Sequence, residues 1–83
     1  MDWTGDLNDD CFLRTDDGYQ AHAEAMDDNE WCCIVTHGDT WPPPFNGRMV
    51  YHSAEQDIWP RDGKAARLLC ELVIDADRWR QRT

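Results

Sequence analysis

The chain has 83 residues, 41% of them hydrophobic, and a formal net charge of −9 at pH 7. This length excludes two hydrophobic cores and the apolar content excludes a disordered acidic chain, so we expect a single domain over residues 1–83. No apolar stretch approaches the roughly 20 residues of a membrane span, and residues 1–4 lack the basic start of a signal peptide. We therefore expect a cytoplasmic protein without membrane contact.

The first half of the chain predicts two β-strands joined by a tight turn. Residues 11–15 form a short apolar segment that ends in Asp16-Asp17-Gly18, where glycine can adopt a positive φ. Residues 19–26 then alternate, with alanines at every second position and polar side chains between them. Small residues on one face predict close packing under a helix.

Two further strands and a helix complete the predicted elements. Residues 31–37 are the most apolar segment and predict a central strand, and residues 48–53 predict a fourth strand, followed by a helical turn over residues 53–56. From Asp62, a suitable N-cap, apolar residues recur with the period of an α-helix. The face that we expect to be buried contains Ala65, Ala66, Leu68, Leu69, Leu72, Val73, Ala76 and Trp79.

These elements predict an α+β fold. We expect an antiparallel meander of three or four strands with one long C-terminal helix packed on one face. Trp3, Trp31, Trp59 and Trp79 are expected in the core.

Nearly all of the negative charge lies in the first half of the sequence. Residues 1–40 contain eleven acidic residues and one basic residue, Arg14, whereas residues 41–83 contain six acidic and seven basic residues. On the predicted topology, the acids gather at the two ends of the meander, about 26 Å apart. Acids at turns are often only solvated, but such a one-signed surface favours a basic protein partner and repels nucleic acid and anionic membranes. The acidic candidates for the partner-binding site are Asp9, Asp10, Asp16, Asp17, Asp27, Asp28, Glu30 and Asp39.

A proline-rich segment between the third and fourth strands gives two more candidates. Trp41 and Phe45 flank three consecutive prolines, which favour a rigid extended conformation. A rigid aromatic segment loses little entropy when it docks on a partner. The alternative is that both aromatic side chains fold back and cover the open face of the sheet.

Cysteine and histidine spacing argues against a cofactor. Cys11, Cys32, Cys33 and Cys70 show neither a disulfide framework nor a Cys-x-x-Cys pair, so we expect buried free thiols. His22, His37 and His52 belong to no known catalytic motif. We expect neither a metal nor another cofactor, and no enzymatic activity.

This chain is expected to be a small acidic domain with free cysteines, a meander and one helix. In size, charge and architecture it resembles the small phage-encoded inhibitor proteins of the anti-CRISPR type. It is also similar to immunity proteins and antitoxins that neutralise basic nucleases. The first resemblance implies a protein in the cytoplasm of the host cell that binds a CRISPR effector complex and sterically blocks its access to DNA or RNA.

We therefore expect an acidic inhibitor that binds a basic protein or ribonucleoprotein surface and does not itself bind nucleic acid. An immunity protein or antitoxin is the alternative that uses the same physics. A small zinc-binding module and a structural subunit of a larger assembly remain as further alternatives, and the sequence leaves the oligomeric state open.

Overall fold

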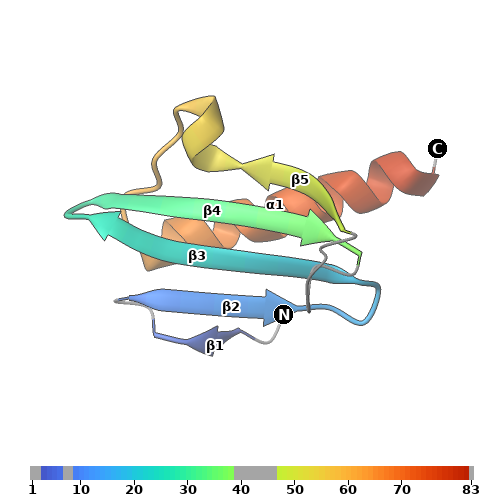
Figure 1. Cartoon of the computed structure of the whole chain (residues 1–83), viewed down its shortest axis with the longest axis horizontal. Coiled ribbons are helices and arrows are strands. Elements are labelled where there is room, and N and C mark those ends of the chain that lie inside the picture. The colour runs from blue at the N-terminus through green and yellow to red at the C-terminus, as the bar shows by residue number, and fades with distance from the viewer. Residues whose placement is uncertain (1–2, 7–8, 39–46, 83) are drawn as a thin grey trace.

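The computed structural model of the chain describes residues 3–6, 9–38 and 47–82. Within them, five strands pair with their sequence neighbours in one antiparallel meander, and α1 lies across one face of this sheet (Figure 1). The predicted α+β fold is confirmed, with one strand more than the upper count that the sequence predicts. In chain order, the elements are β1 (Thr4–Gly5), β2 (Asp10–Arg14), β3 (Tyr19–Asp27), β4 (Glu30–His37), β5 (Arg48–His52), the 3-10 helix η1 (Ser53–Gln56) and α1 (Gly63–Arg82).

The additional strand, β1, is a two-residue edge strand. Thr4 and Gly5 pair with Phe12 and Cys11 of β2, and Thr4 Oγ1 donates a hydrogen bond to the Phe12 carbonyl oxygen at 3.3 Å. Gly5 has a φ of 98°, and a Cβ atom there would lie 2.2 Å from the Asp10 carbonyl oxygen. Two residues are too few to show a period-2 pattern, so the sequence alone did not reveal this strand.

The main core lies between the sheet and α1. Leu13, Tyr19, Ala21, Cys33 and Val35 point from the strands towards the helix and are almost fully buried. Cys70 and Ile74 meet them from α1. The prediction that the alanine face of β3 packs under a helix is confirmed, because Ala21 and Ala23 are both buried.

The helix begins where the sequence predicts but buries a different stripe. Asp62 caps it, since its Oδ1 accepts a hydrogen bond from the Ala65 N–H at 2.8 Å. The buried helical residues are Gly63, Ala66, Cys70, Ile74 and Asp77. Most of these side chains are small, so they allow α1 to approach the alanines of β3 closely.

The three largest exposed apolar residues of α1 belong to the face that we expected to be buried. Leu68, Leu72 and Trp79 are 56%, 57% and 67% exposed. Ala66 of the expected set is buried, and Leu69 and Val73 are partly buried against the core. The helix is therefore apolar on two opposite sides, and periodicity alone selected the wrong one.

Two of the four tryptophans expected in the core are not there. Trp31 is buried and Trp3 is partly buried against both core clusters, but Trp59 and Trp79 are exposed. All four cysteines are buried and free, as predicted. The predicted helical turn is η1, and its Ser53 Oγ accepts a hydrogen bond from the Cys33 N–H at 2.8 Å.

No helix among the described residues has both the length and the apolar character needed to cross a membrane.

Candidate functional site

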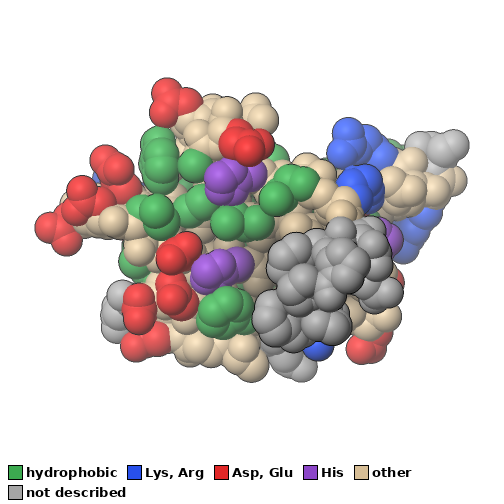
Figure 2. Space-filling model, in the orientation of Figure 1, with side chains coloured by type: hydrophobic (Ala, Val, Ile, Leu, Met, Phe, Trp, Pro, Cys, Tyr) green, Lys and Arg blue, Asp and Glu red, His purple; other side chains and the backbone are tan. Residues whose placement is uncertain are grey.

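Six carboxylates gather at one end of the sheet, around the start of β2 and the β3–β4 turn. We call this set the acidic end, and it consists of Asp9, Asp10, Glu24, Asp27, Asp28 and Glu30. Figure 2 shows acidic side chains concentrated there, with basic side chains at the opposite end of the molecule. Four of the six are exposed, and Asp10 and Glu24 are partly buried.

Strand register places these acids against one another. Asp10 lies directly opposite Glu24 across β2 and β3, and Asp27 lies opposite Glu30 across β3 and β4. Like charges at directly opposed positions destabilise a sheet, typically by a few tenths of a kcal/mol to about 1 kcal/mol each. The chain therefore maintains a concentrated negative field at a cost in its own stability.

Little positive charge balances the acidic end. In the described part of the chain, the one ion pair that involves any of these six acids joins Asp10 Oδ1 and His22 Nε2 at 3.8 Å. Both atoms are shielded from solvent and neither has a hydrogen-bond partner in the structure. The four exposed acids of this end would offer acceptors to a cationic group of a partner, since no Lys or Arg side chain of the described residues pairs with them.

In the other predicted acidic cluster, Asp17 is neutralised within the chain. Asp17 accepts hydrogen bonds from Arg78 Nε at 2.7 Å and Arg78 Nη2 at 2.8 Å. Its other partner is the Thr15 hydroxyl, at 2.6 Å. The Arg78 guanidinium holds the pKa of Asp17 far below its usual range. Asp16, its neighbour, is exposed.

A second carboxylate at this end, that of Asp77, is buried. Asp77 is 1% exposed and accepts hydrogen bonds from the Tyr19 hydroxyl at 2.6 Å and Arg48 Nη2 at 2.8 Å. The Arg48 contact is the main reason that the pKa of Asp77 falls to about 2. Burial, together with the Asp77 carboxylate, raises the pKa of Tyr19 to about 12. Arg80 Nη2 also reaches Asp77 Oδ1, at 3.4 Å.

The two ends of the sheet therefore differ in whether their acids have arginine partners. We call the second one the arginine end, defined by Asp16, Asp17, Arg48, Asp77, Arg78 and Arg80. Of the predicted binding acids, Asp9, Asp10, Asp27, Asp28 and Glu30 come together at the acidic end, whereas Asp16 and Asp17 lie at the arginine end. Asp39, Trp41 and Phe45 lie outside the described residues.

The sheet face away from α1, here called the open face, presents an aromatic pair beside the acidic end. The rings of Phe12 and His22 stack at 4.5 Å between centroids with 9° between their planes. Ile34 is the register partner of His22, and His52 is the register partner of Ile34. These four side chains form an apolar and imidazole row across β2, β3, β4 and β5.

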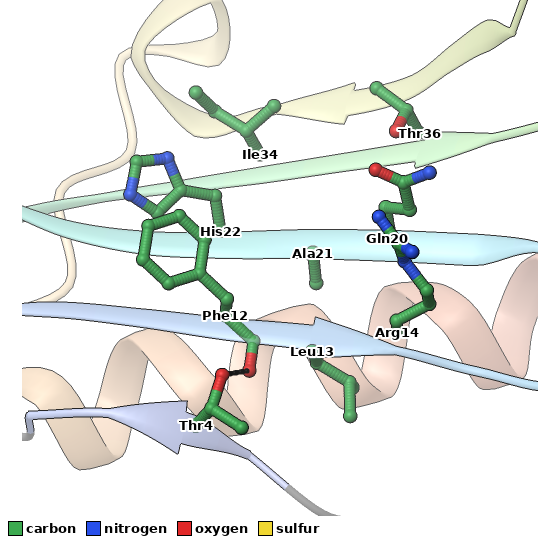
Figure 3. Close-up of a pocket in the computed structure, with 9 residues that line it drawn as sticks. All are labelled: Thr4, Phe12, Leu13, Arg14, Gln20, Ala21, His22, Ile34 and Thr36. Carbon is green, nitrogen blue, oxygen red and sulfur yellow. Dashed lines mark hydrogen bonds between the residues drawn. The ribbon is translucent and has the colours of Figure 1, made fainter. Parts of the chain in front are cut away.

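A cavity of about 570 Å³ extends along this face (Figure 3). Phe12, His22 and Ile34 line one part of it, while Arg14, Gln20 and Thr36 form the next row of register partners along the strands. Phe12, His22 and Glu24 were not predicted from the sequence as site residues. Period-2 alternation placed His22 and Glu24 on the polar face of β3, but only strand register reveals that they adjoin Asp10 and Phe12.

His37 and Cys70 make contacts within the fold. His37 Nε2 lies 2.9 Å from the Asp17 carbonyl oxygen, and the His37 ring packs on Tyr19 at 4.3 Å. A hydrogen bond with Cys33, together with burial, strongly raises the pKa of Cys70. Over residues 3–6, 9–38 and 47–82, no group of three or more His, Cys, Asp or Glu side chains is arranged to hold a metal ion.

No protein-family model matches this chain, and neither a curated protein nor a solved structure is similar to it. The chemistry of the acidic end and the open face therefore carries the functional proposal.

Proposed function

We propose that this chain is an acidic protein inhibitor whose acidic end binds a basic, nucleic-acid-binding surface of a protein or ribonucleoprotein and sterically blocks its access to DNA or RNA. The observation that carries the proposal is that acids occupy directly opposed register positions twice, Asp10 with Glu24 and Asp27 with Glu30. Lysine and arginine side chains of a partner would turn this internal repulsion into attraction.

The density of negative charge supports a nucleic-acid-binding partner in particular. Opposed side chains in an antiparallel pair lie about 4.5–5.5 Å apart at Cβ. Phosphates along one strand of DNA follow each other at about 3.4 Å of helix axis. Six carboxylates at the adjoining ends of three strands therefore offer a basic groove a charge density of the same order as its nucleic-acid ligand.

The open face would supply an apolar and aromatic contact surface beside the charged acidic end. Protein interfaces combine an apolar or aromatic centre with a polar rim. Here the stacked Phe12 and His22 rings, with Phe12 49% exposed, lie next to Asp10 and Glu24. The carboxylates would direct the encounter and the aromatic pair would hold the partner once it is bound.

Within this class, the proposed identity is an inhibitor of the anti-CRISPR type, which acts on a CRISPR effector complex. The support for it is the resemblance in size, charge and architecture. An immunity protein or antitoxin would use the same acidic end on a basic nuclease, so the identity of the target decides between the two.

The test compares two triple variants with equal net charge. The acidic-end variant carries Asp27→Asn, Asp28→Asn and Glu30→Gln, three exposed acids whose replacements keep the side-chain shape. The control variant carries Asp16→Asn, Glu55→Gln and Asp75→Asn, which are exposed acids elsewhere on the chain. Asp17 stays unchanged in both, because its pairing with Arg78 contributes to the fold.

Each protein is immobilised and used to capture targets from host lysate and from a panel of purified CRISPR effector complexes. We expect wild type and control to capture a basic nucleic-acid-binding protein and to abolish its DNA or RNA binding. The acidic-end variant should bind at least about 10-fold more weakly, since three charged contacts are lost. Equal binding by both variants, or a captured target that still binds nucleic acid, would contradict the proposal.

A further inference from the structure

The outer face of α1 carries a continuous apolar stripe that nothing in the described structure covers. Leu68, Leu72 and Trp79 are more than half exposed, and the spacings of four and seven residues place them on one line along the helix. Ala65 and Ala76 lie on the same line. We call these five residues the outer stripe.

The outer stripe lies opposite the buried stripe. At about 100° per residue, Leu72 lies about 200° around the helix from Cys70, which is fully buried in the core. A helix with one packed face normally presents polar residues on its other side. Two leucines and a tryptophan there are a contiguous exposed apolar surface of the kind that marks an interaction site.

The order of residues along the outer stripe is self-complementary. When two copies of α1 pack antiparallel about a two-fold axis at Leu72, the residue n positions before Leu72 faces the residue n positions after it. Leu68 then faces Ala76, and Ala65 faces Trp79. Leu72 meets its own copy on the axis, and in every other pair a large side chain meets a small one, as interdigitated packing favours.

Charge complementarity favours the same arrangement. The start of α1 lies at the acidic end, because the Pro60 carbonyl oxygen, three residues before the helix, accepts a hydrogen bond from the Trp31 N–H at 2.7 Å. The last turns of α1 lie at the arginine end, where Arg78 binds Asp17. An antiparallel pair therefore brings the acidic end of each copy towards the arginine end of the other.

We propose that the chain forms a symmetric dimer in which two copies of α1 pack antiparallel through the outer stripe, centred on Leu72. The open face of each copy lies on the side of the sheet away from α1 (Figure 1). It therefore faces outward in this dimer. The assembly thus presents two open faces and two acidic ends to partners. This dimer does not depend on the proposed function, since it needs no partner.

Sedimentation equilibrium of the purified chain, from about 1 µM to about 1 mM, tests the dimer without any target present. One helix face is a small interface, so we expect a monomer–dimer equilibrium within this range. Leu72→Lys, at an exposed position that should leave the fold unchanged, is expected to weaken dimerisation by at least about 100-fold, because each interface loses two leucines. Met49→Lys, at an exposed apolar residue of β5, is the matched control and should dimerise like wild type.

Disulfide cross-linking tests the direction of packing. The four native thiols are buried, so a new surface cysteine is the one accessible thiol among the described residues. Leu72→Cys on the two-fold axis should form a covalent dimer under mild oxidation. Ala65→Cys lies seven residues from the axis, about 21 Å from its copy in the antiparallel dimer, and should not.

Three outcomes would overturn the proposal. The first is a wild type that stays monomeric throughout the concentration range, and the second is a Leu72→Lys variant that dimerises like wild type. The third is cross-linking through Ala65→Cys, which would indicate parallel helices, in which Leu72→Cys would cross-link as well. If the wild type is monomeric and Leu72→Lys loses binding to the captured target, the outer stripe belongs to the target and not to a second copy.

Discussion

Asp77 is the one buried charged side chain among the described residues, and its partners connect three elements. Tyr19 reaches it from β3 and Arg48 from β5, while Asp77 itself belongs to α1. A buried carboxylate is tolerable only when hydrogen bonds and opposite charge replace its water. This cluster fixes the rotation of α1 about its axis, since turning the outer stripe inward would move Asp77 away from Tyr19 and Arg48.

The lowered pKa of Asp77 predicts acid sensitivity. Its pKa in the folded chain is about 2, below the ordinary value of 3.8, so the folded state favours the ionised carboxylate. The resulting stabilisation is fully present above about pH 4 and is lost as the pH falls through about 2. At pH 7, Asp77→Asn should lower the free energy of unfolding by about 3 kcal/mol, because Arg48 loses its charged partner.

Urea denaturation of wild type and Asp77→Asn at pH 7, 4, 3 and 2 measures this effect. The difference between the two proteins should shrink from pH 4 to pH 2. Asp75→Asn, an exposed change on the same helix, serves as the control and should stay close to wild type at every pH. A constant difference between wild type and Asp77→Asn across this range would contradict the assignment.

At the scale of elements, the strand ends show a conflict between stability and binding. Glu30→Lys places an opposite charge at the register position across from Asp27, so the free energy of unfolding should rise by about 0.5 kcal/mol. The same change should weaken target binding, since it removes a carboxylate and adds a cation. Chemical denaturation and the capture assay together test this prediction.

Asp16→Lys is the control for this experiment, because it makes the same change in net charge at an exposed position of the arginine end. We expect it to leave target binding close to wild type. A Glu30→Lys variant that is less stable than wild type would show that repulsion at the turn is not significant.

Element prediction from the sequence succeeded where a pattern is long. Four strands and α1 were predicted because each has enough residues to show a period, and Asp62 marked the helix start. Strand β1 has two residues and shows none. The buried side of α1 was predicted wrongly because the helix has two apolar sides, and only contacts with β3 distinguish between them.

At the scale of the whole molecule, the charge is arranged as a gradient from the acidic end to the arginine end. Asp17 and Asp77 are neutralised by arginines, whereas the acidic end repels itself. Salt screens such repulsion, with a Debye length of about 10 Å at 0.1 M. Raising NaCl from about 20 mM to about 200 mM should therefore raise the free energy of unfolding by about 0.5–1 kcal/mol.

The same salt increase should weaken target binding, so stability and affinity should respond to salt in opposite directions. Urea denaturation and binding titrations over this salt range measure the two effects. The acidic-end triple variant is the control and should show a flatter response in both. A fall in wild-type stability with salt would mean that attractive ion pairs outweigh the repulsion.

The sequence by itself determined the α+β class, the meander, the free thiols and the excess of acid in the first half. These properties follow from composition and local periodicity, which can be read from the sequence without knowledge of tertiary contacts. The tertiary structure decided which acids remain without a basic partner, because Asp17 meets Arg78 sixty-one positions later while Asp10 meets Glu24. It also decided that Phe12 stacks on His22 and that Leu72 faces outward. Strand register and helix rotation are set by contacts between distant residues, and that information appears only when the chain is folded.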